Sequence, residues 1–213
     1  VGTVNSGSTF ARSLLRFANL QNPNPGTIVA VANLSLYAEE SQSCTATGVV
    51  LAGLQGGFNA NSVWTNQPAT LTSPAATTTN TAKAGGTGCP AGRFDLDATA
   101  LVQSWMNGNQ TNFGLRLRAG NESANSNRKI FSSGDTSNTA NQPRLSITFN
   151  TPPPQPVQAL PLHDSTVMTT TPTLTADPVT DADGTDVDYW FSIWTDDSPQ
   201  WGGQVISSGW IEE

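Results

Sequence analysis

The stretch Leu115-Arg116-Leu117-Arg118-Ala119 alternates strictly between apolar and basic side chains. Successive side chains of a β-strand point to opposite faces of its sheet, so this alternation predicts a strand with one buried and one wet face. The same period of two recurs at residues 34–38 and 145–149. These patterns predict a sheet protein in which one face of each strand packs on a core.

Further short apolar segments, such as 13–17 and 48–54, are separated by Gly, Asn and Pro. Many short strands between turn residues are typical of a β-sandwich or jelly roll. Residues 65–92 are low in complexity and rich in Thr and Ala, which predicts a long surface loop. We therefore expect the first 150 residues to form an all-β jelly-roll sandwich.

One short helix interrupts the strands. Leu101, Val102 and Trp105 lie at positions i, i+1 and i+4, which places them on one face of a helix. Asp97 is suited to the N-cap, because its carboxylate can accept hydrogen bonds from the free amides of the first turn. Asn107-Gly108 predicts the end of the helix.

A proline-rich segment divides the chain. Thr151-Pro152-Pro153-Pro154-Gln155-Pro156 lacks most of the amide donors that a strand needs, so we interpret residues 151–160 as a stiff linker between domains 1–150 and 161–213. The net charge of −7 supports this division. Residues 1–150 hold all nine Lys and Arg against six acids, a balance of +3, whereas 151–213 hold ten acids and no Lys or Arg, a balance of −10.

Composition also limits the partners. The acidic C-terminal part lacks the basic surface that nucleic acid requires, and no apolar run approaches the ~20 residues of a membrane span. We therefore expect neither a nucleic-acid partner nor a membrane span.

The chain has two cysteines, Cys44 and Cys89. An even count in a chain rich in Thr and Asn predicts one disulfide and an extracellular location. A redox or metal pair is the less favoured alternative, because there is no Cys-x-x-Cys and the single histidine is His163.

Four segments carry a resemblance to a known family. They are Ser13-Leu14-Leu15-Arg16-Phe17, Val63-Trp64-Thr65-Asn66-Gln67-Pro68, Phe94-Asp95-Leu96 with Ala100-Leu101-Val102-Gln103-Ser104-Trp105, and Phe131-Ser132-Ser133-Gly134-Asp135 with Pro143-Arg144-Leu145. In this order the chain resembles the DNRLRE-type domain, a secreted jelly-roll module of bacterial and archaeal surface proteins, over residues 10–149. The resemblance implies a non-catalytic binding or adhesion module, and some such domains are classed as carbohydrate-binding modules for uronate-rich polysaccharides. The family's Ser-Arg-Glu triplet is replaced here by Ser133-Gly134-Asp135.

Residues 161–213 are similar to the start of the immunoglobulin-like domains that follow DNRLRE-type domains in actinobacterial surface and Rhs-type proteins. Strands are predicted at 172–176, 187–194 and 204–210, with a turn at Asp181-Ala182-Asp183-Gly184. An immunoglobulin-like sandwich needs about 100 residues, so we expect a partial one here.

Basic residues concentrate between 116 and 144, where five of the nine lie. Arginine binds carboxylates through two parallel hydrogen bonds, so this region could bind an acidic glycan. The candidate ligand-binding residues are Arg116, Arg118, Arg128 and Lys129. The alternative is a structural role, in which these arginines form ion pairs with Asp95, Asp135 or Glu122, or lie on a solvated face.

Two other groups of residues could bind ligands. Trp64 and Trp105 lie in segments that carry the resemblance, and we expect both to pack inside the fold rather than stack on a sugar. The carboxylates that surround the glycine of the second domain's turn could hold Ca²⁺; they are Asp181, Asp183, Asp186 and Asp188. The EF-hand spacing fails, and Asp-rich turns are also common without metal. We therefore expect either no cofactor or a calcium ion at this turn.

No catalytic motif is present, neither a Gly-x-Ser-x-Gly elbow nor a His-Glu-x-x-His helix. A hydrolase could draw a carboxylate pair from Asp95, Asp97, Glu122 and Asp135, but Asp97 is better explained as a helix cap and Asp95 as a partner of an arginine. We therefore expect no enzyme. The function favoured is an extracellular module that binds polysaccharide or another surface glycan, beside further domains of the same polypeptide. The main alternative is a structural stalk or shell segment of a cell-surface or Rhs-type protein.

Overall fold

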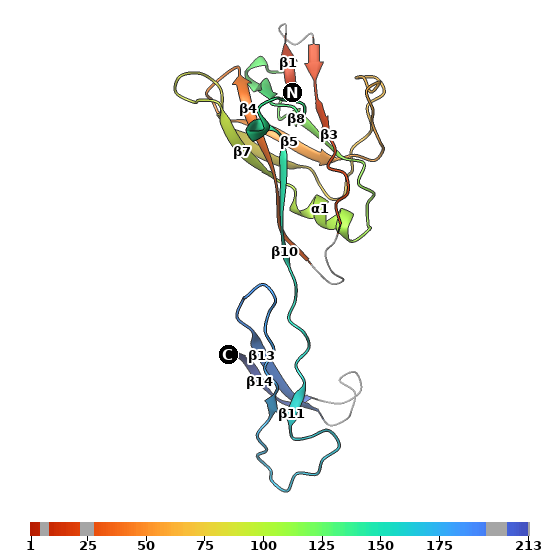
Figure 1. The fold of residues 1–213 in the computed structure, drawn as a ribbon, viewed down its shortest axis with the longest axis vertical. Coiled ribbons are helices and arrows are strands. Elements are labelled where there is room, and N and C mark those ends of the chain that lie inside the picture. The colour runs from red at the N-terminus through yellow and green to blue at the C-terminus, as the bar shows by residue number, and fades with distance from the viewer. Residues whose placement is uncertain (5–8, 22–27, 195–203, 213) are drawn as a thin grey trace. The chain divides into compact units, whose positions relative to one another are not determined.

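The computed structural model describes residues 1–4, 9–21, 28–194 and 204–212 (Figure 1). The chain divides into two compact units, Val1–Phe149 and Asn150–Glu213, close to the boundary expected from the proline-rich segment. No helix within the described ranges is long and apolar enough to span a membrane.

The first sheet of the first unit is built around its longest strand, β4 (Ile28–Ser41). Strand β4 lies between β7 (Gly92–Asp97) and β10 (Arg144–Asn150), and it also pairs with the short β9 (Lys129–Phe131). The β4–β7 pairing is antiparallel and sets Leu34 opposite Leu96. Both leucines are fully buried, so this register directs one face of the sheet into the core.

The second sheet has the order β3-β8-β5-β6. Its strands are β3 (Ser13–Leu15), β8 (Leu115–Ala119), β5 (Thr47–Gly53) and β6 (Thr77–Thr81). Strand β6 corrects one expectation, because residues 77–81 lie inside the predicted surface loop. The reason is that β-branched threonines suit an edge strand, and they pair here with β5.

The core lies between these two sheets. The alternation predicted for residues 115–119 is observed in β8, where Leu115, Leu117 and Ala119 are fully buried and the two arginines between them are not. The remaining core residues come from the strands of both sheets and from the helix: Val29, Ala32, Leu34, Leu36, Val49, Leu51, Leu96, Ala98, Leu101 and Val102. Burial of each Leu or Val contributes about 1.5–3 kcal/mol. The predicted all-β sandwich with one short helix is confirmed.

Helix α1 (Thr99–Met106) covers one end of the core with Leu101 and Val102. Its N-cap is Ala98, one residue later than expected, and Ala98 makes no side-chain cap. Asp97 still ends strand β7, and its carboxylate accepts a hydrogen bond from the Thr99 N–H at 2.9 Å. The expected carboxylate contact therefore exists, but from the residue before the cap.

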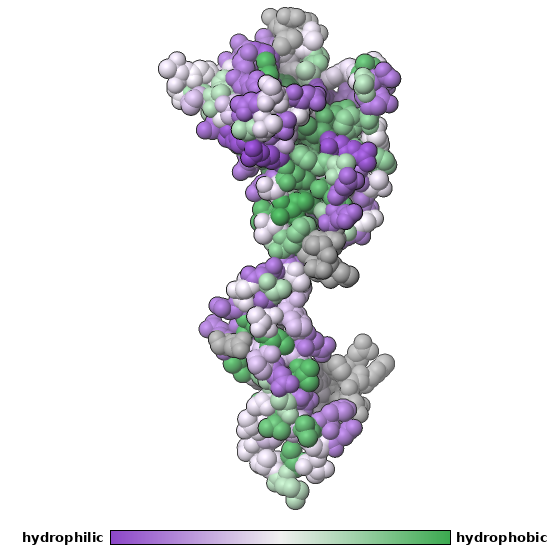
Figure 2. All heavy atoms as spheres, in the orientation of Figure 1, coloured by the Kyte–Doolittle hydropathy of each residue, from purple (hydrophilic) through white to green (hydrophobic). Residues whose placement is uncertain are grey.

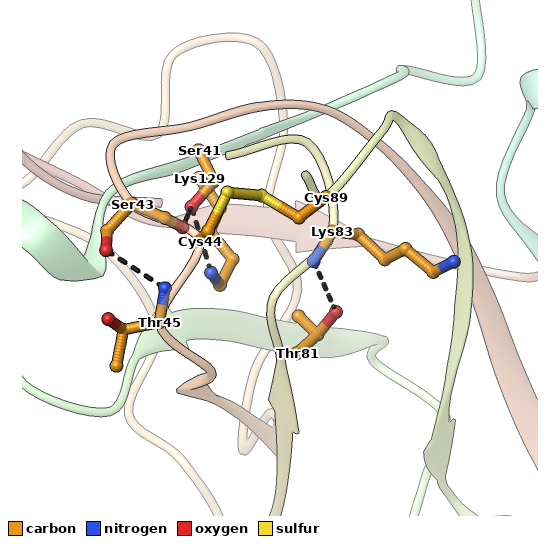
Figure 3. The surroundings of a disulfide bond; sticks show 8 residues. All are labelled: Ser41, Ser43, Cys44, Thr45, Thr81, Lys83, Cys89 and Lys129. Atoms are coloured by element: carbon orange, nitrogen blue, oxygen red, sulfur yellow. Dashed lines mark hydrogen bonds between the residues drawn. A yellow bond between two sulfur atoms is a disulfide. The ribbon is translucent and has the colours of Figure 1, made fainter. Parts of the chain in front are cut away.

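The disulfide between Cys44 and Cys89 is confirmed (Figure 3). It joins the segment after β4 to the segment before β7, with a sequence separation of 45. The two segments approach closely beside it, since a Cβ placed on Gly85 would lie 2.3 Å from the carbonyl oxygen of Ser43. Only glycine allows this approach.

Small elements complete the first unit. They are the hairpin of β1 (Gly2–Val4) and β2 (Thr9–Ala11) and the 3₁₀ turns η2 (Asn125–Asn127) and η3 (Thr139–Asn141). Hydrophobic residues gather over part of the visible face of this unit and are bordered by hydrophilic residues (Figure 2).

The second unit contains two antiparallel strand pairs. Strand β11 (Gln158–Leu160) pairs with β12 (Thr175–Ala176), and β13 (Asp188–Trp194) pairs with β14 (Gln204–Glu212). Strand β11 corrects the predicted linker, which was expected to run to residue 160. The prolines stop at Pro156, so the amides after it are free to pair. The immunoglobulin-like assignment stays a prediction.

Candidate functional site

The outer face of the β3-β8-β5-β6 sheet carries the two arginines that the sequence singled out. Because Leu115 and Leu117 point into the core, Arg116 and Arg118 point outward. Across the sheet Arg116 lies between Leu14 of β3 and Ala52 of β5. The arginines therefore lie in the middle of the sheet rather than at its edge.

The segment between β5 and β6 packs onto this outer face. Leu54 forms a bridge with Thr70, and the Gln55 N–H donates to the Ala69 carbonyl at 2.9 Å. Arg116 reaches this segment through Nη2, 3.4 Å from the hydroxyl of Thr70. This part of the predicted loop thus forms one wall beside the arginines.

A third arginine, which the sequence analysis did not single out, joins the outer face. Arg12 donates from Nε and Nη2 to the two carboxylate oxygens of Glu122, at 2.8 and 2.7 Å. Its Nη1 donates to the amide oxygen of Gln67 at 3.0 Å. Its guanidinium carbon lies 4.3 Å from the centroid of the Trp64 ring. Arg12 is therefore fixed from several sides.

The charges of this cluster do not balance. Burial first, and then the neighbouring cations Arg12 and Arg118, lower the pKa of Arg116 from its usual value, while Glu122 acts in the opposite direction. Hydrogen bonds from Arg12 hold the pKa of Glu122 below its usual range, with all three arginines contributing. Three guanidinium groups therefore share one carboxylate.

Within the described ranges Arg116 and Arg118 form no ion pair with Asp95, Asp135 or Glu122, so of the structural alternative only the solvated face is left for these two arginines. The only ion pair of Glu122 among the described residues is with Arg12. Arg118 donates from Nη1 to the carbonyls of Ala119 and Gly120, at 2.9 and 3.3 Å. Within the described ranges the Nε of Arg116 is buried without a hydrogen-bond partner. Because neither guanidinium forms an ion pair among the described residues, the cluster keeps positive charge that an anion can pair with.

An open hollow of about 390 Å³ lies beside Arg12. Its lining residues come from the β2–β3 region and from the wall segment: Phe10, Ala11, Arg12, Leu14, Phe58, Asn59, Ser62, Val63, Trp64 and Gln67. Trp64 was expected to pack inside the fold, yet 47% of its surface is exposed. Trp105 does pack against the core, as expected.

The structure places the other two basic candidates differently. Arg128 forms an ion pair with Glu40, and it also bonds the side-chain oxygen of Gln42. Lys129 is fully buried and donates to the Ser41 hydroxyl at 3.1 Å (Figure 3). This corrects its placement: β9 turns the Lys129 side chain into the fold, where it cannot reach a ligand on the surface.

The Asp-rich turn of the second unit is held by its own hydrogen bonds. Asp181 is buried, and its carboxylate accepts the Asp183 N–H at 2.7 Å. The Asp183 carboxylate accepts the N–H of Thr151, and Asp186 and Asp188 are exposed. Within the part of the chain that the structure describes, no three His, Cys, Asp or Glu residues are grouped to hold a metal ion. Calcium at this turn stays a prediction, which titration of the chain with CaCl₂ can test.

The carboxylates that a hydrolase could use have other surroundings. Glu122 is paired with Arg12, while Asp95 and Asp97 are exposed on β7 of the opposite sheet and Asp135 is exposed in a turn. Asp95 is thus not the buried partner of an arginine that we expected, because its strand position points to solvent.

Comparison with known proteins identifies a family for the first unit. A family model described as "Carbohydrate-binding module family 96" matches residues 3–149. A search of curated proteins finds no match.

Proposed function

The chain belongs to carbohydrate-binding module family 96, and we propose that its first unit binds an acidic polysaccharide through the outer face of the β3-β8-β5-β6 sheet. The observation that carries this proposal is the unbalanced cluster of Arg12, Arg116 and Arg118 around the single carboxylate of Glu122.

The chemistry of the cluster favours a carboxylated ligand. A guanidinium group holds a carboxylate through two parallel hydrogen bonds, and these charge-assisted bonds are about twice as strong as neutral ones. A uronate unit that approaches Arg116 would give its guanidinium a carboxylate partner, where among the described residues it has only the 3.4 Å contact of Nη2 with the Thr70 hydroxyl. It would also relieve the repulsion between Arg116 and its two cationic neighbours.

The role proposed is binding, with no chemical step. The exposed carboxylates of β7 lie on the opposite sheet from the arginines, which does not favour a pair acting on one bond. The Cys44–Cys89 disulfide is compatible with an extracellular module, where the glycan would belong to a cell surface or matrix. Adhesion through that glycan, beside further domains of the same polypeptide, is part of the proposal.

The test compares binding of the chain to polygalacturonate and to a neutral galactan by isothermal titration. We expect binding to polygalacturonate that weakens with salt, and a loss of roughly tenfold or more in the double variant Arg116→Ala/Arg118→Ala. The matched control is Arg16→Ala/Arg144→Ala, which removes the same charge at two exposed sites.

Each outcome of this comparison bears on the proposal. Retained affinity in the control supports a specific site, whereas equal losses in both double variants would reduce the binding to net charge. Absence of binding to every polysaccharide tested would contradict the proposal and favour a structural stalk or shell segment.

A further inference from the structure

We propose that the hollow beside Trp64 is a subsite for one pyranose ring of the bound polysaccharide, with the exposed part of the indole as its apolar contact surface and Arg12 as the residue that positions it. This inference rests on the proposed function and adds the apolar half of the recognition. It also reverses the expectation that Trp64 only packs.

The indole of Trp64 is held by two neighbouring side chains. Phe10 stacks on it with a ring-centroid distance of 5.6 Å and an interplanar angle of 27°, and Arg12 lies 4.3 Å from its centroid. Phe10 and Arg12 are two residues apart in an extended segment, so their side chains project to the same side. Both side chains therefore contact the indole, and 47% of the Trp64 surface remains exposed beside them.

The exposed part of the indole suits contact with a sugar ring. The axial C–H groups of a pyranose form an apolar patch on one side of the ring, and the negative face of an aromatic system attracts their partial positive charge. The exposed part of the Trp64 ring contributes no hydrophobic free energy to folding, because that area stays in contact with water. A ligand that covers the ring would recover this free energy.

The hollow offers polar groups for the hydroxyls of the same ring. Asn59 and Ser62 line it, and the Ser62 oxygen accepts the Asn59 N–H at 3.1 Å, which leaves the hydroxyl proton free to be donated. The volume of about 390 Å³ falls within the range of small-ligand sites, about 300–1,000 Å³. An apolar platform with a few convergent polar groups is the usual composition of such sites.

Arg12 acts as a positioning residue rather than as a ligand for the glycan. Its Nε and Nη2 are engaged by Glu122 and its Nη1 by Gln67, so the guanidinium is locked against the indole. Gln67 in turn donates to the Trp64 carbonyl at 2.9 Å. This chain of hydrogen bonds fixes the orientation of the indole before any ligand arrives.

The subsite adjoins the arginine cluster. Leu14 lines the hollow and lies directly opposite Arg116 on the neighbouring strand. Neighbouring strands are about 4.8 Å apart, so one polysaccharide chain can place a ring on Trp64 and the carboxylate of a nearby unit on Arg116. Arg116 would then select for charge, and Trp64 for the ring itself.

The test measures polygalacturonate affinity by isothermal titration, and intrinsic fluorescence, for the wild-type chain and for Trp64→Ala and Trp64→Phe. We expect Trp64→Ala to lose roughly tenfold or more in affinity, the scale of a buried aromatic anchor, and Trp64→Phe to retain part of it. The ligand-induced fluorescence change should be lost in Trp64→Phe and retained in the control Trp105→Phe. Thermal unfolding confirms that each variant is folded.

The role of Arg12 is tested by Arg12→Lys, which keeps the positive charge but cannot form the bidentate pair with Glu122. We expect a loss similar to that of Trp64→Ala, and no further loss when the two substitutions are combined. Additive losses would show that Arg12 binds the glycan independently and would overturn its positioning role.

The outcomes separate this inference from the proposed function. If polygalacturonate binding is lost in Arg116→Ala/Arg118→Ala but unchanged in Trp64→Ala, the subsite is refuted and the proposed function stands. If the wild-type chain binds no polysaccharide, both fall.

Discussion

Removal of the Cys44–Cys89 disulfide tests how strongly this sandwich depends on the covalent connection between the segment after β4 and the segment before β7. The double variant Cys44→Ser/Cys89→Ser keeps the chain length and polarity but opens a loop whose ends are separated by 45 in sequence. On the chain-entropy model, closing a loop of this length lowers the conformational entropy of the unfolded state and so raises its free energy by about 4 kcal/mol. Residual structure in the unfolded chain reduces this value, so we expect the free energy of unfolding of the first unit to fall by about 3 kcal/mol.

The assay is hydrogen exchange of the β5 and β8 amides across a urea series, because these strands report on the first unit alone. With a slope of about 2 kcal/mol/M, the urea midpoint should fall by about 1.5 M. Reduction of the wild-type chain with dithiothreitol is the matched control, since it opens the same loop without a substitution.

A loss of less than about 1 kcal/mol in both experiments would refute the reasoning. It would show that other contacts already hold the two segments together in the unfolded ensemble. The hydrogen bond from the Gly85 N–H to the Cys89 carbonyl, at 3.1 Å, would be one native contact to test next.

Three further substitutions test the energetics of the fold. Lys129→Met should raise the free energy of unfolding at pH 7 by about 1–2 kcal/mol, because burial lowers the pKa of the Lys129 ammonium in the folded protein. Wild-type stability then rises as the pH approaches 10.5, so the urea midpoints of the variant and the wild type should converge by about pH 10. A variant that is less stable than the wild type at pH 7 would contradict this. Glu122→Gln should lower the free energy of unfolding by about 1 kcal/mol above pH 4.5. This loss disappears as the pH falls and Glu122 of the folded wild type, whose pKa is lowered, becomes protonated. An equal loss at pH 3 and pH 7 would exclude the ion pair with Arg12 as its source. Gly114→Ala should cost about 2 kcal/mol, because φ is +102° and the new Cβ would lie 2.5 Å from the Leu15 carbonyl oxygen; an unchanged melting temperature would contradict the strain.

The sequence predicted the strands whose burial alternates and failed where contacts depend on register. In β8 the alternation from Leu115 to Ala119 is sufficient, because the period of two alone decides which side chains enter the core. Strand β6 was missed because its threonines show no apolar period, and only pairing with β5 makes it a strand. The helix start was displaced by one residue, because Asp97 is still paired with Asn33 in the sheet.

The site shows the same limit. Arg116 and Arg118 were found because they occupy alternate positions of a clear strand. Arg12 was missed because its relation to them depends on the pairing of Ser13 with Leu117, which no local pattern encodes. One signal was available, since Arg12 shares the period of two with Leu14. The exposure of Trp64 depends on how residues 55–76 fold over the sheet, which the sequence does not show.

The ends of the two sheets have a consequence for crowded surroundings. Unpaired strand edges invite neighbouring molecules to add strands, the first step of fibril growth. Here β3 is three residues long and β6 five, while the border strands of the other sheet carry exposed charges at Asp95, Asp97 and Arg144. A short or charged edge strand offers a strand from a neighbouring molecule few backbone groups with which to pair. Many copies of this module could therefore be displayed side by side at high local concentration and remain separate molecules.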